Sequence, residues 1–417
     1  MIGLPHATSP VVGEVVVPGS KSETNRALVL AALADAPSRL TGALQSRDSD
    51  LMIGALRKLG VLVEPSAGTL LVTPPGQFRG AQDIDCGLAG TVMRFVPPVA
   101  ALADGPSSFV GDPHASERPM APLLDGLRQL GCRVTGDSLP FTVEPAGRAG
   151  RETSIDASGS SQFVSGLLLI GALLPHGLQV RHTGATLPSR PHIDMTVHML
   201  RARGVRIDEP DERTWVVHPG SITALDHVIE PDLTNASVFL AAAALTEGDV
   251  SVSGWPEVSL QPGALFLDVA ERMGADVARD DGTVRLRGRG PLRGIDVDLT
   301  AASELTPVVA ALAALAEGTT RIRGVGHIRG HETDRLAALV RELSRLGAVA
   351  EETADGIVIE GGHPLRPTTV ETYADHRMVH FAALVGLVTP GTHVTDLQCV
   401  SKTMPDFERD WRGLVTR

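Results

Sequence analysis

The sequence predicts an α/β fold in which six similar repeats place sheets around a helical interior. Two periodic features lead to this prediction. An Ala/Leu-rich stretch recurs about every 70 residues through the 417-residue chain. An amphipathic stretch that closes on a glycine, followed by a Val-rich segment, recurs with the same period. Because six copies are too many for one core of roughly 250–300 residues, we expect two domains of three repeats each.

The Ala/Leu-rich stretches begin with polar residues and are then apolar on nearly all sides, which is typical of buried helices. They cover residues 26–35, 93–104, 162–175, 235–248, 304–318 and 376–391. Each is followed by a short β-like segment. We therefore expect one interior helix in every repeat, with a strand after it.

The amphipathic stretches are expected to be half-exposed helices that end at a glycine, because glycine adopts a positive φ without strain. The closing glycines are Gly60, Gly131, Gly204, Gly274, Gly347 and Gly413. The sixth repeat shows no strand pattern after its glycine, so we expect a strand around Val11–Val17 to complete it. The break between the domains is expected near Ile229–Pro231.

The composition is that of an ordinary globular chain, with 43% hydrophobic and 21% charged residues. The net charge of −12 argues against nucleic acid as the main partner, because binding a phosphate backbone needs a basic surface. No apolar run approaches the roughly 20 residues of a membrane helix, so no membrane partner is expected. The first 20 residues hold no Lys or Arg, which argues against a secretory or transit leader.

The cysteines and histidines show no metal-ligand spacing. Cys86, Cys132 and Cys399 show no pairing pattern either, so a reducing cytoplasm is the expected location. We expect several of the 14 histidines to lie on the surface, with His331 and His376 as exceptions. Neither a metal nor an organic cofactor is expected.

Lysine is nearly absent, since 34 of the 37 basic residues are arginine. In such a chain, a lysine is expected where a compact or titratable amine is needed. Lys58 lies on an apparently exposed helix face and needs no functional explanation. Lys21 and Lys402 lie in polar segments and are functional candidates.

The polar starts of the buried helices differ from repeat to repeat. Free N–H groups and the positive dipole end make a helix N-terminus an anion site, whereas Ser, Thr, Asp and Asn there also serve as ordinary caps. Capping alone does not explain cations in the first turns, which oppose the dipole. These cations are Lys21, Arg26, Arg94 and Arg377. The pattern predicts binding of phosphates and carboxylates.

Glu332 and Arg335 lie three residues apart in a segment that enters a helix. This spacing allows both side chains to share one helical face near a ligand. A simple ion pair between them is the alternative, and the sequence leaves both possibilities open.

Seven motifs then occur in order across the chain, and together with the repeats they resemble the 5-enolpyruvylshikimate-3-phosphate synthase family. The motifs are PGSKSETNR (18–26), LAGTVMR (88–94), ERP (117–119), SGSSQF (158–163), GHETDRL (330–336), DHRM (375–378) and SKTMPDF (401–407). The resemblance implies a two-domain inside-out α/β barrel of six βαβαββ repeats, with the active site in the cleft between the domains. It places the shikimate 3-phosphate side in residues 19–229. Phosphoenolpyruvate and the catalytic carboxylates are assigned to residues 1–18 plus 230–417.

The family transfers the enolpyruvyl group of phosphoenolpyruvate to the 5-hydroxyl of shikimate 3-phosphate and releases phosphate. The resemblance implies addition to a tetrahedral intermediate followed by elimination, with no cofactor. It also implies a monomer that works in the shikimate pathway and is inhibited by glyphosate.

The resemblance assigns roles residue by residue. For shikimate 3-phosphate it implies Lys21, Ser22, Arg26, Ser160, Ser161, Gln162, Ser189, Glu304 and His331, with Arg190 nearby. For phosphoenolpyruvate it implies Lys21, Gly90, Arg118, Gln162, Arg335, Arg377 and Lys402. Thr91, Arg94, Asp48 and Asp232 are expected to support and position these groups. The implied catalytic residues are Glu304 as the base for the 5-hydroxyl, and Glu332 and Lys21 for proton transfer at the methylene carbon and the departing phosphate.

Two departures from the more familiar members of the family affect these roles. Glu304 stands where they have Asp, which keeps the carboxylate. His331 stands where they have Lys, and a histidine can lose its charge near neutral pH. We therefore expect the affinity for shikimate 3-phosphate to weaken as the pH rises through the pKa of His331.

Two alternatives remain. The UDP-N-acetylglucosamine enolpyruvyl transferases share the fold but use a loop cysteine near the position of Arg118, and residues 111–119 hold none. They also carry Asn where this chain has Ser22. A repeat scaffold without activity is the other alternative, and the presence of Lys21, Glu304 and Glu332 argues against it.

Overall fold

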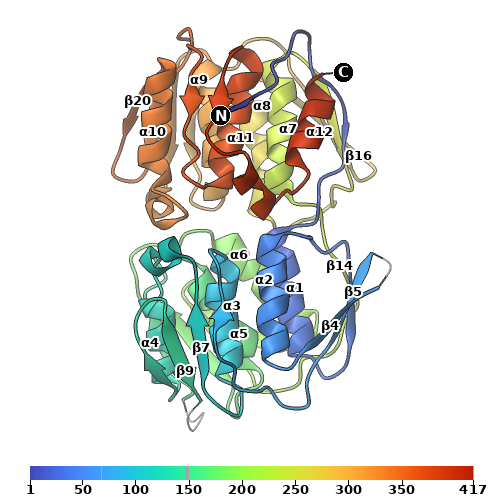
Figure 1. The fold of residues 1–417 in the computed structure, drawn as a ribbon, viewed down its shortest axis with the longest axis vertical. Helices are drawn as coiled ribbons and strands as arrows, with labels where there is room; N and C mark the ends of the chain where they lie inside the picture. Colours follow the sequence, from blue (N-terminus) through green and yellow to red (C-terminus); the bar gives the residue numbers. More distant parts are fainter. Residues whose placement is uncertain (67, 146–149, 417) are drawn as a thin grey trace. The chain divides into compact units, whose positions relative to one another are not determined.

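The computed structural model describes residues 1–66, 68–145 and 150–416. The chain divides into two compact units (Figure 1). One is Gly19–Ile229, called here the 19–229 unit. The other joins Met1–Pro18 to Glu230–Arg417 and is called the 230–417 unit. Each unit has its own hydrophobic core.

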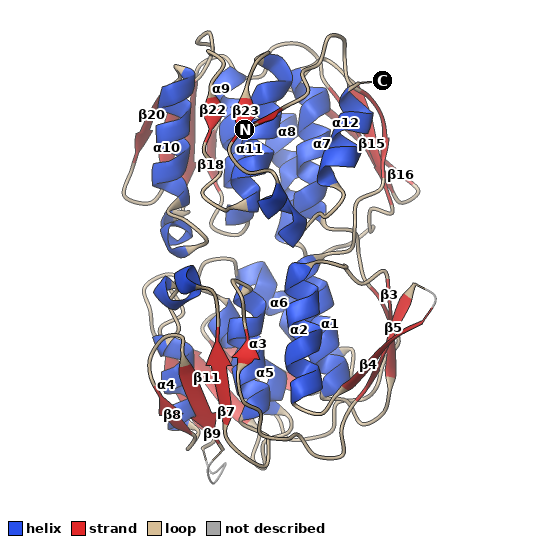
Figure 2. Cartoon of the chain, viewed as in Figure 1, coloured by secondary structure: helices blue, strands red, loops and turns tan. Residues whose placement is uncertain are grey.

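The expected interior helices are present, and the mixed α/β repeat fold is confirmed. Nearly all of their residues are buried. They are α1 (Lys21–Ala32), α3 (Gly90–Ala100), α5 (Gln162–Gly171), α7 (Leu233–Leu245), α9 (Thr306–Leu315) and α11 (His376–Val388). Strands flank the helices of the 19–229 unit in Figure 2, with β7 and β9 on one side and β3 to β5 on the other.

The amphipathic helices follow as expected, one in each repeat. They are α2 (Arg47–Lys58), α4 (Ala121–Gln129), α6 (Arg190–Arg201), α8 (Phe266–Met273), α10 (Arg335–Leu346) and α12 (Phe407–Val415). Five of the six glycines have a positive φ beyond the helix, for example 109° at Gly274 and 91° at Gly347. The prediction for Gly413 is wrong, because this residue lies inside α12 on its exposed side.

In the 19–229 unit the described strands form three four-stranded sheets with the orders β14-β3-β5-β4, β6-β7-β9-β8 and β10-β11-β13-β12. In each sheet the first two strands are parallel and the others pair antiparallel. The strands are β3 (Ser38–Thr41), β4 (Leu62–Ser66), β5 (Thr69–Thr73), β6 (Ile84–Asp85), β7 (Ser107–Val110), β8 (Arg133–Thr135), β9 (Phe141–Glu144), β10 (Glu152–Ile155), β11 (Leu178–His182), β12 (Ile207–Asp211), β13 (Thr214–Val217) and β14 (His227–Val228).

The 230–417 unit has, among its described strands, the sheets β16-β17-β15-β2, β18-β19-β21-β20 and β1-β23-β22. The strands are β1 (Ile2–Gly3), β2 (Val12–Val15), β15 (Asp249–Ser253), β16 (Asp276–Asp280), β17 (Thr283–Arg287), β18 (Asp296–Asp298), β19 (Thr319–Arg323), β20 (Val349–Glu352), β21 (Ile357–Glu360), β22 (Thr369–Val370) and β23 (His393–Val394). The described residues also form short 3₁₀ helices. They are η1 (Pro113–Glu117), η2 (Pro262–Leu265), η3 (Ser303–Leu305), η4 (Gly326–Gly330) and η5 (Gln398–Lys402).

The strand expected around Val11–Val17 exists as β2, but the prediction that it completes the sixth repeat is wrong. β2 pairs in parallel with β15 and so completes the fourth repeat. The sixth repeat is completed by β1, which pairs antiparallel with β23. The first repeat takes its parallel strand from the far end of its unit, because β14 pairs with β3. In the first and fourth repeats, the strand that completes the sheet therefore comes from the stretch of chain just before it passes from one unit to the other. We call this arrangement the strand exchange.

None of the helices in the described part of the chain has both the length and the apolar character that a membrane span requires.

Candidate active site

The N-termini of the interior helices fall into two groups. Side chains cap α1, α7 and α11, where Ser20, Asp232 and Asp375 accept a backbone N–H bond from the first turn. Among the described residues, the interior helices α3, α5 and α9 have no such side-chain cap, and neither does the amphipathic helix α6. Ordinary capping therefore accounts for the first group. In the second group the first backbone N–H groups, which lack intrahelical partners, can serve a ligand.

In the 19–229 unit, the first turns of α1 carry two cations, Lys21 and Arg26. Lys21 is the first residue of α1, and its Nζ lies 3.4 Å from Oδ2 of the buried Asp48 on α2. Arg26 is 1% exposed and donates to Thr196 Oγ1 at 2.7 Å and to the Ser22 carbonyl at 2.9 Å. These bonds fix the direction of Arg26 before any substrate arrives. Lys21 and Ser22 are half-buried.

A second cluster forms at the start of α3. A Cβ placed on Gly90 would lie 3.0 Å from Nη2 of Arg118 and 3.3 Å from Nη1 of Arg94. Arg118 donates to the Leu88 carbonyl at 3.0 Å, and Arg94 donates to the Pro119 carbonyl at 2.9 Å. Two guanidinium groups therefore converge on an uncapped helix N-terminus, which is an arrangement suited to a phosphate.

The serine segments lie at the starts of α5 and α6. Ser161 precedes α5 and is buried, and Ser160 Oγ accepts from the Gln162 backbone N–H at 3.3 Å. The buried Oε1 of Gln162 has no hydrogen-bond partner among the described residues. Ser189 precedes α6 in the left-handed region, with φ 51° and ψ 42°. Such a conformation is rare for a non-glycine residue and is often found at functional sites.

Arg190 does not join this group of serines. Its Nε lies 2.7 Å from Asp194 Oδ1 and its Nη2 lies 2.7 Å from Glu209 Oε2. Its guanidinium also stacks over Trp215 at 5.2 Å. Two carboxylates therefore already neutralise Arg190. The helix α6 begins at Arg190.

In the 230–417 unit, Arg335 is the centre of a buried network. It is 2% exposed. Its Nε donates to Asp375 Oδ2 at 2.7 Å, and its Nη2 donates to Glu332 Oε2 at 2.8 Å. Glu332 Oε1 in turn accepts from Lys402 Nζ at 2.6 Å. Burial alone would lower the pKa of Arg335, but the carboxylates of Asp375 and Glu332 outweigh it and raise that pKa.

The ion pair that the sequence left open as an alternative is therefore present. Glu332 precedes α10, which begins at Arg335, so the two residues do not share a helical face. Glu332 lies between two cations and is nearly buried, with 8% of its side chain exposed. A carboxylate held in this way can pass a proton to a neighbouring ligand without leaving its position.

Arg377 lies beside this network on α11. Its backbone N–H donates to Asp375 Oδ1 at 2.9 Å, and its Nη1 donates to Asn235 Oδ1 at 3.1 Å. Its buried Nε has no partner among the described residues. Burial lowers the pKa of Arg377 below its ordinary value, and the nearby Asp232 opposes that effect. An anionic ligand would restore the charge balance of this guanidinium.

Glu304 lies in η3, directly before α9. It is close enough to His327, His331, Arg335 and Arg377 to raise the pKa of each. The structure thus brings Glu304, His331, Arg335 and Arg377 into one electrostatic cluster. Glu332 and Lys402 join it through Arg335.

The expectation that His331 carries a titrating charge is wrong. Its Nδ1 lies 2.8 Å from Nη1 of Arg335, which can only donate. Burial lowers the pKa of His331 well below 6.5, and the positive charge of Arg335 lowers it further. His331 is therefore neutral at working pH, with its proton on Nε2. The expectation that His331 and His376 are the exceptions among surface histidines is incomplete. His182, His192 and His380 are buried as well as His376.

Sequence reasoning gave no role to two residues of the network, Asp375, which the motif at 375–378 contains, and Asn235. Asp375 is fully buried, caps α11 and holds Arg335. Asn235 joins Arg377 to the Thr403 carbonyl at 3.1 Å, next to Lys402. Asp375 directly precedes the first residue of an expected helix, so its capping position could have indicated its role. No pattern marked Asn235 in the sequence.

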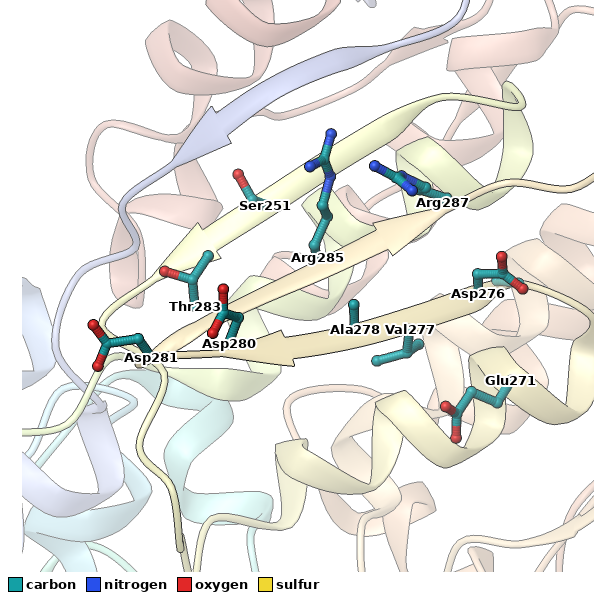
Figure 3. Close-up of a pocket in the computed structure, with 11 residues that line it drawn as sticks. Ser251, Glu271, Asp276, Val277, Ala278, Asp280, Asp281, Thr283, Arg285 and Arg287 are labelled. Carbon is teal, nitrogen blue, oxygen red and sulfur yellow. The ribbon is translucent and has the colours of Figure 1, made fainter.

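A separate hollow lies on the outer face of the fourth repeat's sheet. Figure 3 shows Ser251, Arg285, Arg287 and Asp280 among its lining side chains. Asp249 neutralises both arginines and lies 2.8 Å from Nε of Arg287. None of the candidate site residues lines this hollow.

Comparison with known proteins places the chain in a family. A sequence model of the family described as EPSP synthase (3-phosphoshikimate 1-carboxyvinyltransferase) matches residues 5–411. The 3-phosphoshikimate 1-carboxyvinyltransferase of Mycobacterium ulcerans (strain Agy99) is 51% identical over 420 residues, covering 99% of this chain and 97% of the relative.

Solved structures agree with this result. An EPSP synthase from Acinetobacter baumannii superposes with a TM-score of 0.82 at 25% identity, covering 99% of this chain and 97% of that one. The enolpyruvyl transferase NikO from Streptomyces tendae superposes at 0.78 and 21% identity, with coverage of 98% and 96%, and supports the fold alone. The chain belongs to the EPSP synthase (3-phosphoshikimate 1-carboxyvinyltransferase) family.

Proposed function

We propose that this chain transfers the enolpyruvyl group of phosphoenolpyruvate to the 5-hydroxyl of shikimate 3-phosphate and releases phosphate. The observation that carries the proposal is the network of Arg335, Glu332 and Lys402 with Arg377 beside it. It combines cations for an anionic substrate with a buried carboxylate for proton transfer. The reaction forms a step of the shikimate pathway to chorismate and the aromatic amino acids.

Shikimate 3-phosphate is assigned to the polar helix starts of the 19–229 unit. Ser160, Ser161 and Ser189 offer hydroxyls to its 3-phosphate at uncapped helix N-termini. Lys21, Ser22 and Arg26 bind its carboxylate and ring hydroxyls, and Gln162 contacts both substrates. His331 and Glu304 are assigned to the same substrate, His331 as a neutral donor through Nε2.

Phosphoenolpyruvate carries a phosphate and a carboxylate. Arg335, Arg377 and Lys402 bind it from the 230–417 unit, and the Arg377 Nε supplies an N–H that the described residues leave without a partner. Lys21, Gly90, Arg118 and Gln162 bind it from the 19–229 unit. We therefore expect turnover to require groups from both units. Fixing two anions in this way supplies an effective molarity of about 10⁵–10⁸ M.

The chemistry is addition followed by elimination. Glu304 takes the proton of the 5-hydroxyl as its oxygen bonds to the central carbon of phosphoenolpyruvate, while the methylene carbon gains a proton. The resulting tetrahedral intermediate then loses a proton from the methyl group so formed, which restores the methylene, and the carbon–oxygen bond to the phosphate breaks. Glu332 and Lys21 carry these proton transfers.

Glyphosate is proposed as an inhibitor that competes with phosphoenolpyruvate beside Gly90. The working form is proposed to be a monomer, as the family resemblance implies. A cytoplasmic location is proposed from the cysteines. Each is a free thiol, and burial raises the pKa of Cys86 and of Cys399 to about 12.

The experiment that tests the proposal measures phosphate release from phosphoenolpyruvate with either shikimate 3-phosphate or UDP-N-acetylglucosamine as acceptor. Release with shikimate 3-phosphate alone is the expected result. Release with the nucleotide sugar alone would contradict the proposal and favour the sister activity. No release with either acceptor would favour a scaffold without activity.

A further inference from the structure

His182 lies where two strands and two loops of the 19–229 unit meet. It ends β11 and stands opposite Ile155, the last residue of the parallel strand β10. Parallel strands end at the same edge of a sheet. The loop that leaves β10 leads to Ser160 and Ser161, and the loop that leaves β11 leads to Ser189. The side chain of His182 is therefore at the root of both serine segments.

The ring of His182 holds the first of these loops. The Ala157 backbone N–H donates to Nδ1 of His182 at 3.1 Å, and His182 is 2% exposed. An Nδ1 that accepts this bond carries no proton, so the ring is neutral with its proton on Nε2. The carbonyl of Ala157 in turn accepts from the Ser160 backbone N–H at 3.1 Å. The imidazole thus fixes the peptide on which the turn at Ser160 is built.

The second loop is fastened at the same place. Arg213 donates to the Gly184 carbonyl at 2.9 Å and to the Ala185 carbonyl at 3.2 Å. The His182 backbone N–H donates to the Arg213 carbonyl at 2.8 Å. A Cβ on Gly184 would lie 2.0 Å from Asp156 Oδ1 and 2.7 Å from Cε1 of His182. The two loops are therefore in direct contact around the ring.

We propose that His182 is a positioning residue that holds the 156–161 and 183–189 loops in the relation that the 3-phosphate of shikimate 3-phosphate requires. The inference rests on the proposed function, which assigns that phosphate to Ser160, Ser161 and Ser189. His182 acts through the backbone at Ala157 and touches neither substrate.

The role depends on a neutral ring and therefore on pH. Burial lowers the pKa of His182 below 6.5, the carboxylate of Asp156 raises it, and the guanidinium of Arg213 lowers it. Protonation of His182 at Nδ1 would place a second N–H group against the Ala157 N–H. The hydrogen bond between the two residues would then break. The neutral form is kept above pH 6.5 and is lost as the pH falls through the lowered pKa. The affinity for shikimate 3-phosphate should then fall.

The test compares His182→Asn, His182→Leu and wild type by steady-state kinetics between pH 5.5 and 8. The Asn side chain offers an oxygen to the Ala157 N–H and does not titrate, whereas Leu leaves that buried N–H without a partner. At pH 7.5 we expect His182→Asn to keep its KM for shikimate 3-phosphate within about twofold, and His182→Leu to raise it about fivefold or more. The KM for phosphoenolpyruvate and kcat should change less.

The pH dependence of KM below pH 6 distinguishes protonation of the His182 ring from protonation of the ligand. The phosphate of the ligand has its second pKa at about 6. Below pH 6 the KM of wild type should rise more steeply than that of His182→Asn, because the ligand titrates equally with both. His198→Asn, which removes an exposed histidine from α6, should follow wild type. Parallel profiles for wild type and His182→Asn, or an unchanged KM in His182→Leu, would overturn the inference.

Turnover of the wild type and hydrogen exchange in residues 156–161 distinguish failure of the proposed function from failure of the proposed contact. Absence of turnover in wild type itself would refute the proposed function, and the inference would fall with it. Hydrogen exchange in residues 156–161 reads the contact without any substrate. Exchange there should be slow in wild type and His182→Asn and faster in His182→Leu at pH 7.5, and equal rates would refute the contact. If His182→Leu does not fold, the pH profile of His182→Asn decides.

Discussion

Glu304 has the most demanding role among the proposed residues, because it must take a proton from a hydroxyl while it lies near the guanidinium groups of Arg335 and Arg377. The Glu304→Gln variant keeps the size and loses the base. We expect kcat to fall about 10²–10⁴-fold, while calorimetric titration shows affinity for shikimate 3-phosphate within a few-fold of wild type. Glu317→Gln, an exposed carboxylate beyond the other end of α9, is the matched control. An unchanged kcat in Glu304→Gln would refute its role.

Gly90 makes a second prediction at the residue scale. An added methyl would lie 3.0 and 3.2 Å from the two terminal nitrogens of Arg118, which can move aside by a few tenths of an ångström. Glyphosate is one atom longer than phosphoenolpyruvate between its two acidic groups, so it tolerates the lost space less well. Gly90→Ala should raise the glyphosate inhibition constant about tenfold, or about 1.4 kcal/mol, and raise the KM for phosphoenolpyruvate less.

Inhibition assays on Gly54→Ala supply the control for that comparison. Gly54 lies in α2 with open space around its Cβ position. Equal changes in the inhibition constant and in KM for Gly90→Ala would remove the proposed difference between the two ligands.

At the scale of elements, Asp375 at the N-terminus of α11 has two roles, since it caps the helix and pairs with a residue of the candidate site. One oxygen caps the helix at the Arg377 N–H, and the carboxylate also pairs with Arg335. Asp375→Asn can still cap but leaves the buried Arg335 without this charge. We expect the free energy of unfolding in urea to fall by about 3–5 kcal/mol, the usual cost of breaking a buried pair.

The exposed pair of Asp276 and Arg289 is the control for this loss, because both side chains are more than half exposed. Asp276→Asn should change stability little. Asp375→Asn and Asp276→Asn with the same small effect would show that the buried pair contributes no more than a surface pair.

The helices were the most predictable elements, and the reason is local. Interior helices such as α7 and α9 show their apolar character directly in the sequence, and glycines such as Gly274 mark where helices end. The prediction that Gly413 ends a helix was wrong, because a helix tolerates glycine on its exposed side. The sequence alone could not separate capped from uncapped N-termini, since Ser20 and Ser161 have the same chemistry and differ in backbone conformation, with ψ 123° at Ser20 and −18° at Ser161.

At the scale of the whole molecule, buried histidines make stability depend on pH. His380 is fully buried, and burial together with Arg377 and Arg335 lowers its pKa well below 6.5. As the pH falls below 6.5, the unfolded chain takes up a proton that the folded chain refuses. Stability is therefore present above pH 6.5 and is lost towards lower pH, by up to about 1.4 kcal/mol per pH unit for each such group.

His380→Phe tests this dependence, because Phe suits the aromatic surroundings of Phe407 and does not titrate. Urea unfolding at pH 7.5 and 5.5 should show a smaller loss of stability in the variant than in wild type. The same loss in both proteins would assign the acid sensitivity to other groups.

The strand exchange was the part of the fold that the sequence could not supply. The repeats in the sequence indicated that the sixth one lacked a strand. Both β1 and β2 are short and apolar enough to be that strand. Only the pairing of β2 with β15 and of β1 with β23 decides between them. The candidate site shows the same limit. Motifs identified Arg335 and Glu332, whereas the contact of Asn235 with Arg377 depends on three-dimensional packing.

The most direct test of the proposed transfer follows the bridging oxygen of phosphoenolpyruvate. Substrate labelled with ¹⁸O between carbon and phosphorus is turned over with shikimate 3-phosphate, and the released phosphate is analysed by mass spectrometry. Addition followed by elimination breaks the carbon–oxygen bond, so the phosphate should carry the label and should form only when the acceptor is present. Unlabelled phosphate, or release without the acceptor, would show that the phosphorus–oxygen bond breaks and would contradict enolpyruvyl transfer.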